Sequence, residues 1–296
     1  MSLTNPTGEQ YVRLRGALRR ARGVMARDLP WTGSSPWGVF VSETMLQQTP
    51  VSRVIRYWES FVTAYPSPSD AARAPVGEIL EGWRGLGYPR RALRLREAAT
   101  IMVDEYGGRV PDSLESLRRL PGVGEYTASA VASFAFSRRV PVIDTNVGRV
   151  LARALANRSL RPAEARLEAS RLLPRDDVGA FNQSLLDLGA QWCRPQPRCE
   201  ECPVRRVCAW REAGGDDPAT TSAFVSRPQA RFEGSERQRR GLVLGSLESA
   251  PLSFELLAQR TGLQRSDLER VVGALVREGF CTLGEDGVAW PTERSR

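Results

Sequence analysis

Four cysteines lie within sixteen residues of one another, at Cys193, Cys199, Cys202 and Cys208, with gaps of five, two and five residues. Four thiolates at this spacing can surround a tetrahedral metal ion or a four-iron cluster, so the loop must fold back on itself. The spacing alone leaves zinc open, although structural zinc sites usually contain two Cys-x-x-Cys pairs and this loop contains one. Two disulfides are less favoured, because nothing marks the chain as exported. Cys281 lies in a distant apolar stretch and is expected to be an ordinary buried cysteine.

The basic residues exclude several kinds of chemistry. The 296-residue chain carries a formal net charge of +8, and all 42 of its basic residues are arginine. Histidine is also absent, so neither a histidine base nor a lysine Schiff base is possible. The positive charge suits a polyanionic partner. No apolar run approaches the length of a membrane span, and the N-terminus lacks a secretion signal, so we expect a bacterial, cytoplasmic protein associated with the nucleoid.

Hydrophobic periodicity predicts a mainly α fold. Residues 8–28 form an amphipathic pattern with Tyr11, Leu14, Leu18 and Val24 at near-helical spacing. Helical patterns continue over residues 37–192, interrupted by proline and glycine pairs. Residues 213–235 have little periodicity and are predicted to be a linker.

The C-terminal residues predict a second, smaller domain. Helical patterns cover residues 236–247, 253–260 and 264–278, and two apolar stretches at 280–283 and 288–290 suggest a hairpin. Three helices and a hairpin indicate a winged-helix-like domain over residues 236–291. Arginines at the start of its first helix are candidate phosphate contacts, unless the domain simply packs on the core; they are Arg237, Arg239 and Arg240.

A glycine-rich turn lies between two helical segments at residues 120–128. Gly122 and Gly124 flank Val123, so the backbone can turn tightly and present successive N–H groups at the start of the next helix. Such a turn can bind a phosphate of DNA without reading its sequence, although on its own it is often only a tight turn.

Taken together, the glycine turn, Asp144 and the four-cysteine loop resemble the helix-hairpin-helix DNA glycosylases related to endonuclease III. Within that superfamily, residues 41–49, 85–88 and 181–190 resemble the MutY-type adenine glycosylases. The resemblance covers residues 8–212. It implies a two-part helical core, with a six-helix part at about 37–140 and an iron–sulfur part at 1–36 and 141–212. It also implies a [4Fe–4S] cluster, a monomer, and double-stranded DNA with a mispaired base as the partner.

The resemblance assigns Glu43 and Asp144 to catalysis. Glu43 would protonate adenine at N7, and Asp144 would stabilise the cationic sugar. The apolar residues around Glu43 favour a raised pKa for its carboxyl group. Tyr126 stands where the lyase branch of the superfamily has its lysine, so the enzyme is expected to stop after base removal. Tyr126 and Asn146 would line the pocket.

The same resemblance implies a set of contacts to DNA. Gln48 and Tyr88 match residues that enter the base stack when the target base is flipped out, with Gln48 filling the gap and Tyr88 lying beside the opposing base. The full set predicted to contact DNA or the base is Trp31, Gln48, Thr49, Tyr88, Gly122, Val123, Gly124, Gln183 and Asp187.

Three features depart from the family pattern. The first cysteine gap is one residue shorter than usual. Thr32 stands where the family commonly has arginine, which puts the neighbouring contacts to adenine in doubt. The C-terminal domain does not resemble the Nudix-type domain with which many relatives recognise 8-oxoguanine. We therefore expect adenine excision opposite both 8-oxoguanine and guanine, with a smaller preference between them.

Two other functions fit part of the pattern. A glycosylase for thymine or uracil opposite guanine would share the glycine turn and the aspartate, but tends to lack the run at residues 43–49. A winged-helix regulator with an iron–sulfur sensor would usually have a more basic recognition helix than residues 264–278, where acidic and basic residues alternate.

Overall fold

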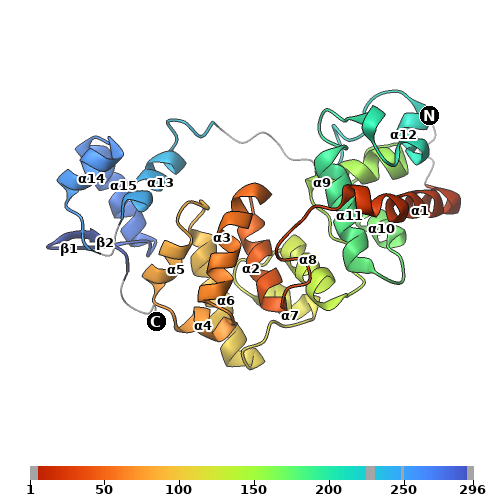
Figure 1. Cartoon of the computed structure of the whole chain (residues 1–296). Helices are drawn as coiled ribbons and strands as arrows, with labels where there is room; N and C mark the ends of the chain where they lie inside the picture. Colours follow the sequence, from red (N-terminus) through yellow and green to blue (C-terminus); the bar gives the residue numbers. More distant parts are fainter. Residues whose placement is uncertain (1–5, 225–230, 248–249, 292–296) are drawn as a thin grey trace. The chain divides into compact units, whose positions relative to one another are not determined.

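The computed structural model describes residues 6–224, 231–247 and 250–291 (Figure 1). Helices dominate these residues, which confirms the mainly α fold class predicted from the sequence. No helix within the described ranges is long and apolar enough to cross a bilayer. Contacts between residues divide the chain into two compact units, called unit 1 and unit 2 below.

Unit 1 comprises residues 1–36, 112–114 and 124–228. Its apolar core draws on most of its helices and includes Leu18, Val147 and Phe181. The elements of unit 1 are α1 (Gly8–Met25), α8 (Glu125–Phe136), α9 (Thr145–Val150), the π-helix η1 (Leu151–Ala156), α10 (Pro162–Leu172), α11 (Val178–Gln191), the 3₁₀ turns η2 (Cys199–Glu201) and η3 (Arg205–Val207), and α12 (Ala209–Ala213).

Helix α1 begins where the sequence predicts and ends earlier. The Thr7 side chain accepts a hydrogen bond from the backbone N–H of Gln10 and so caps the first turn. The helix ends at Met25 instead of residue 28. Val24 is 74% exposed, whereas Met25 is fully buried. The predicted apolar stripe was therefore wrong at Val24, and Met25 supplies the last core contact of the helix.

Unit 2 comprises residues 37–111, 115–123 and 229–296. Around its core, the ring of Phe61 packs edge-on against Trp83 with a centroid distance of 5.7 Å. Its first helices are α2 (Pro36–Leu46), α3 (Val51–Ala64), α4 (Pro68–Arg73), α5 (Val76–Gly82), α6 (Arg90–Tyr106) and α7 (Leu114–Arg119); single residues of α2 and α7 fall in unit 1.

The C-terminal part of unit 2 contains three helices and a hairpin, drawn in blue in Figure 1. Their bounds differ by a few residues from the predicted ones, as expected for helix ends. The Cα partners in the hairpin are Thr282 with Ala289, Leu283 with Val288 and Gly284 with Gly287, and Leu252 forms a further bridge to Val288. The elements are α13 (Glu236–Ser246), α14 (Phe254–Thr261), α15 (Arg265–Arg277), β1 (Thr282–Gly284) and β2 (Gly287–Ala289).

Candidate active site and cysteine pocket

Glu43 lies in unit 2 on α2, a helix that is buried on all sides from Trp37 to Met45. The glutamate side chain is only 3% exposed. The hydroxyl groups next to it bond back to the helix, since Ser42 donates to the carbonyl of Val39 and Thr44 to that of Phe40, each at 2.8 Å. Glu43 is therefore buried within a helix whose other side chains are mostly apolar.

Asp144 lies in unit 1 at the N-cap of α9. Its Oδ1 accepts hydrogen bonds from the backbone N–H groups of Asn146 and Val147, both at 2.8 Å. Its Oδ2 accepts a third bond from Nδ2 of Asn146 at 2.6 Å. Burial raises the pKa of the Asp144 carboxyl group, while these three donors act to lower it and favour the ionised form. The aspartate is thus oriented by the helix that it caps.

The Asn146 side chain also links Asp144 to the cysteine loop through Arg149. The amide oxygen of Asn146 accepts from Nη2 of Arg149 at 2.6 Å. The same guanidinium donates through Nε to the backbone carbonyl of Cys193 at 2.8 Å. A side chain at Gly189 would come within 2.6 Å of Asn146, so α9 and α11 approach closely only because residue 189 is glycine. Tyr126, on α8, is partly buried and packs against the core of unit 1.

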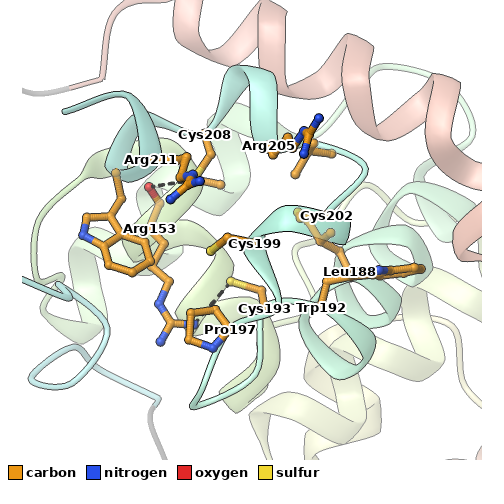
Figure 2. A pocket seen from close by; sticks show the side chains of 13 residues that line it. Arg153, Leu188, Trp192, Cys193, Pro197, Cys199, Cys202, Arg205, Cys208 and Arg211 are labelled. Atoms are coloured by element: carbon orange, nitrogen blue, oxygen red, sulfur yellow. Dashed lines mark hydrogen bonds between the residues drawn. The ribbon is translucent and has the colours of Figure 1, made fainter. Parts of the chain in front are cut away.

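The four clustered cysteines line one pocket of unit 1, shown in Figure 2. None of the four forms a disulfide. Apolar side chains complete most of the lining, including Leu188, Val204 and Trp210. Within the described ranges, no three histidine, cysteine or acidic side chains are arranged so that they could hold a single metal ion. All four thiols nevertheless line the same pocket.

Arg153, on the π-helix η1, enters this pocket and is 2% exposed. It donates to Oδ1 of Asp217 at 2.8 Å through Nε and to Oδ2 at 2.5 Å through Nη2. Its Nη1 lies 3.5 Å from Sγ of Cys193, the contact drawn as a dashed line in Figure 2. Burial acts to lower the pKa of Arg153, but the bonds to Asp217 and Cys193 outweigh it, so the pKa is raised.

Burial makes three of the clustered thiols hard to ionise by themselves. It raises the pKa of Cys193 and Cys208, and it raises that of Cys202 to about 11. A bound metal reverses this balance, because a coordinating thiol gives up its proton. Four sulfur donors in a mostly apolar pocket lined also by Arg153, Arg205 and Arg211 are chemically suited to an iron–sulfur cluster.

The two residues predicted to enter the base stack both lie in unit 2 with positive φ. Gln48, just after α2, has φ 57°, and Tyr88, just before α6, has φ 49°. A left-handed backbone is costly for residues other than glycine, so the surroundings must hold these two turns.

Arg91, on α6, holds both turns at once. Its guanidinium group donates to backbone carbonyls on either side of them, and its Nη2 bonds to Oγ1 of Thr49 at 2.9 Å. Burial lowers the pKa of this 7% exposed arginine to about 10. The carbonyl oxygens that accept from Arg91 belong to Thr44, Met45, Gln47, Leu86, Gly87 and Tyr88.

The predicted glycine turn joins the two units, with Gly122 and Val123 in unit 2 and Gly124 in unit 1. Gly122 has φ 77°, and a side chain there would come within 3.0 Å of Cβ of Arg94. The carbonyl of Gly122 accepts a hydrogen bond at 3.2 Å from Nε2 of Gln47. Gly124 is the N-cap of α8, so the turn leads directly into that helix, as predicted.

The remaining predicted contacts all lie in unit 1. Trp31 is 6% exposed, whereas the neighbouring Thr32 is exposed. Asp187 is 1% exposed and accepts hydrogen bonds from Nε of Arg27 at 2.6 Å and from Nε2 of Gln183 at 2.8 Å. These bonds indicate that Asp187 helps to hold α11 in place.

Sequence analysis missed the buried arginines of both units. Arg149 and Arg153 interrupt an apolar helical run at a spacing of four residues, which was a usable signal for a charged group on a buried face. Arg91 gave no such signal, because α6 carries arginines on several faces and nothing in the spacing marks Arg91 and Arg96, the two that are buried.

Comparison with known proteins places this architecture among DNA repair enzymes. Residues 41–175 match the HhH-GPD superfamily of base excision DNA repair proteins. The chain is 45% identical over 269 residues to an adenine DNA glycosylase of Mycolicibacterium smegmatis, covering 88% of this chain and 90% of that protein. An adenine DNA glycosylase of Mycobacterium tuberculosis H37Rv is 42% identical over 274 residues, covering 88% of both chains. The structure of a thermostable thymine-DNA glycosylase superposes with a TM-score of 0.64 and 28% identity, covering 70% of this chain and 98% of that one.

Proposed function

The chain belongs to the adenine DNA glycosylases of base excision repair, and we propose that it removes adenine mispaired with 8-oxoguanine or guanine by hydrolysing the N-glycosidic bond. The observation that carries this proposal is the environment of the two carboxyl groups that the family pattern assigns to catalysis. Glu43 is buried in an apolar helix, and Asp144 is held by three hydrogen-bond donors. The substrate would be double-stranded DNA, bound by a cytoplasmic monomer.

Glu43 is suited to act as the general acid. A buried carboxylate in apolar surroundings is costly when charged, so such a group tends to keep its proton until a base accepts it. Protonation of adenine at N7 makes the base a better leaving group.

Asp144 is suited to the opposite task. The donors from Asn146 and Val147 favour a negative charge on its carboxylate, and a negative charge stabilises the cationic sugar as the base departs. Tyr126 and Asn146 complete the proposed catalytic set. With no lysine in the chain, strand cleavage through a lysine Schiff base is unavailable, so the product is an abasic site.

Base extrusion is the proposed task of the two strained turns. Gln48 would fill the space left by the flipped adenine, and Tyr88 would lie beside the opposing base. Thr49 and the glycine turn would position the strands, the turn by binding phosphate through its backbone N–H groups.

The four cysteines that line the pocket of unit 1 are the proposed ligands of a [4Fe–4S] cluster. Bound there, the cluster would supply a rigid link between the ends of the loop. The chain itself contributes Arg153, which donates to Sγ of Cys193 and balances negative charge on the thiolates. Purified protein is expected to be yellow-brown and to contain about four irons per chain. Stoichiometric zinc without iron after anaerobic preparation would refute this assignment.

Single-turnover excision tests the proposed function. The duplexes carry adenine opposite 8-oxoguanine, guanine or cytosine, and thymine or uracil opposite guanine. Adenine should be removed opposite the first two partners, whereas preferential removal of thymine or uracil would favour the alternative glycosylase. Glu43→Gln should retain DNA binding and lose excision by several orders of magnitude, because an amide cannot protonate the base. Glu59→Gln, at an exposed position on α3, is the matched control.

A further inference from the structure

The C-terminal domain, residues 231–291, packs against α5 and the turn that follows it within unit 2. The backbone N–H of Gly77 donates to the carbonyl of Pro291 at 3.0 Å, and a side chain at Gly77 would come within 2.6 Å of that oxygen. Arg84 donates through Nη2 to the carbonyl of Leu247 at 2.7 Å, and its guanidinium lies 5.8 Å from the ring centroid of Trp290. These contacts leave no room for even a methyl group at Gly77.

A charged cluster joins the same domain to the start of α6. Glu278 accepts from Nη2 of Arg90 at 2.6 Å, and from Nη1 and Nη2 of Arg240 at 2.7 and 2.9 Å. Both arginines also lie within 6 Å of the ring centroid of Phe280, at 5.9 and 5.6 Å. The start of α6 is thus fixed to α13 two residues away from Tyr88.

Arg237 connects α13 directly to Tyr88. Its Nη1 lies 3.0 Å from the phenolic oxygen of Tyr88. The neighbouring Arg239 instead pairs with Glu236 and Asp267 on the C-terminal domain itself. Of the three arginines expected to contact phosphate, one therefore reaches the turn before α6, and the other two form ion pairs within unit 2.

Tyr88 is consequently held from two sides. Arg91 lies 5.6 Å from the centroid of its ring, on the side of the helical core. Arg237 bonds to its hydroxyl group from the C-terminal domain. The backbone at Tyr88 is strained, with φ 49°, and it follows Gly87, whose φ of 77° is accessible to glycine without strain. A ring on a strained turn takes its direction from the contacts that hold it.

We propose that Arg237 is a positioning residue for Tyr88, through which the C-terminal domain sets how strongly the enzyme discriminates between bases opposite adenine. The inference rests on the proposed function, because it needs Tyr88 to lie beside the opposing base. It gives the domain a task other than phosphate binding. A ring whose direction is fixed responds to the shape of its neighbour, whereas a ring free to turn accommodates several bases.

The test measures single-turnover excision of adenine opposite 8-oxoguanine, guanine and cytosine in the full-length chain. Arg237→Ala should reduce the discrimination between these partners about three- to tenfold, the size expected for one hydrogen bond. Tyr88→Phe, which removes only the hydroxyl group, should have a similar effect. The double variant should be no worse than either single variant, because both remove the same bond. Arg237→Lys should restore part of the discrimination.

Arg239→Ala is the matched control on the same helix and should leave the discrimination unchanged. A second measurement does not depend on excision and uses 2-aminopurine placed beside the mismatch, with every protein in a Glu43→Gln background. The Arg237→Ala substitution should change the fluorescence of the bound duplex when residue 88 is tyrosine. The same substitution should leave the fluorescence unchanged in the Tyr88→Phe variant, because the hydroxyl group that Arg237 holds is then missing.

The outcomes separate the two proposals. If the wild type does not excise adenine, the proposed function fails. If the wild type excises adenine but Arg237→Ala keeps its discrimination, the positioning proposal alone fails. Equal weakening by Arg237→Ala and Arg239→Ala on every duplex, with a reduced salt dependence of binding, would show phosphate contact and overturn the proposal as well.

Discussion

Two buried arginines, one in each unit, are stabilised in different ways. Arg153 in unit 1 faces the carboxylate of Asp217 and the thiol of Cys193, so its charge is balanced within the pocket. Arg91 in unit 2 bonds to backbone carbonyls and to the hydroxyl of Thr49, and burial lowers its pKa to about 10. In unit 1, the positive charge of Arg153 is therefore neutralised by a neighbouring carboxylate. In unit 2, the hydrogen-bond acceptors of Arg91 are neutral, and they lie in or beside the turns proposed to enter DNA. Loss of each arginine should therefore have a different effect.

The largest effect is expected from Arg153→Met. This change leaves Asp217 without its cation and removes the donor to Cys193, so the free energy of unfolding should fall by about 3 kcal/mol or more. Urea denaturation measures the loss, and iron analysis should show fewer metal ions per chain. Arg198→Met removes an exposed pair with Glu201 in the same loop and should cost less than about 1 kcal/mol. Equal results for the two variants would contradict the role given to Arg153.

Arg91→Lys should have the next largest effect. Lysine keeps the charge but offers a compact ammonium with three donors, so it cannot reach all the carbonyls of both turns. We expect a loss of about 2 kcal/mol in the free energy of unfolding and weaker discrimination between opposite bases, with an unchanged salt dependence of DNA binding. Arg94→Lys, at an exposed position on the same helix, is the control. Unchanged discrimination in Arg91→Lys would show that the charge alone suffices.

Asn146→Ala removes one of the three donors to Asp144, the side-chain Nδ2 group, and leaves both backbone N–H donors in place. Its loss should raise the pKa of Asp144 further, because this side-chain hydrogen bond favours the ionised form. A smaller fraction of the carboxylate is then ionised at a given pH, so the acid limb of the pH–rate profile should move to higher pH. Excision at neutral pH should fall about tenfold, as expected for a hydrogen bond to a charged group. In the Asp144→Asn variant, excision should be severely impaired at every pH, and the pH–rate profile should lack this acid limb. If the acid limb of the pH–rate profile does not move, this limb reports the titration of a group other than Asp144.

The smallest effect is expected from Glu278→Gln. Hydrogen bonds from Arg240 and Arg90 lower the pKa of Glu278 to about 2, below the value of about 4.3 for an unfolded glutamate. The stability that the ionised Glu278 contributes through these two arginines is therefore present above about pH 4 and is lost as the pH falls towards 2. At pH 7 the variant should be about 1 kcal/mol less stable in urea denaturation, and the difference should shrink at low pH. A constant difference across this range would mean that charge is not its source.

Local patterns predicted the helices better than they predicted the site. The three C-terminal helices illustrate the success, because α13, α14 and α15 begin and end within one residue of the ranges that the sequence predicted. The four cysteines also lie together as their spacing indicated. Such features depend on neighbours a few residues away, which a single sequence displays directly.

The arginine contacts could not be predicted in the same way. Arg153 meets Asp217 across 64 positions of the chain, and Arg91 meets Thr44 across 47. The π-helix that carries Arg153 also has no local signature in its sequence of leucine, alanine and arginine. Contacts of this kind arise only when the helices pack, and periodicity does not specify which partner a buried arginine meets.

Gln48 and Tyr88 already have positive φ values in the folded protein. A left-handed residue other than glycine costs about 1 kcal/mol or more, and here that cost is already met when the protein folds. The turns proposed to enter DNA would therefore meet the duplex already in this shape, and binding free energy would not be consumed in reshaping them. A variant with glycine at position 48 would have a relaxed turn before it meets the duplex, and would have to order that turn during the encounter.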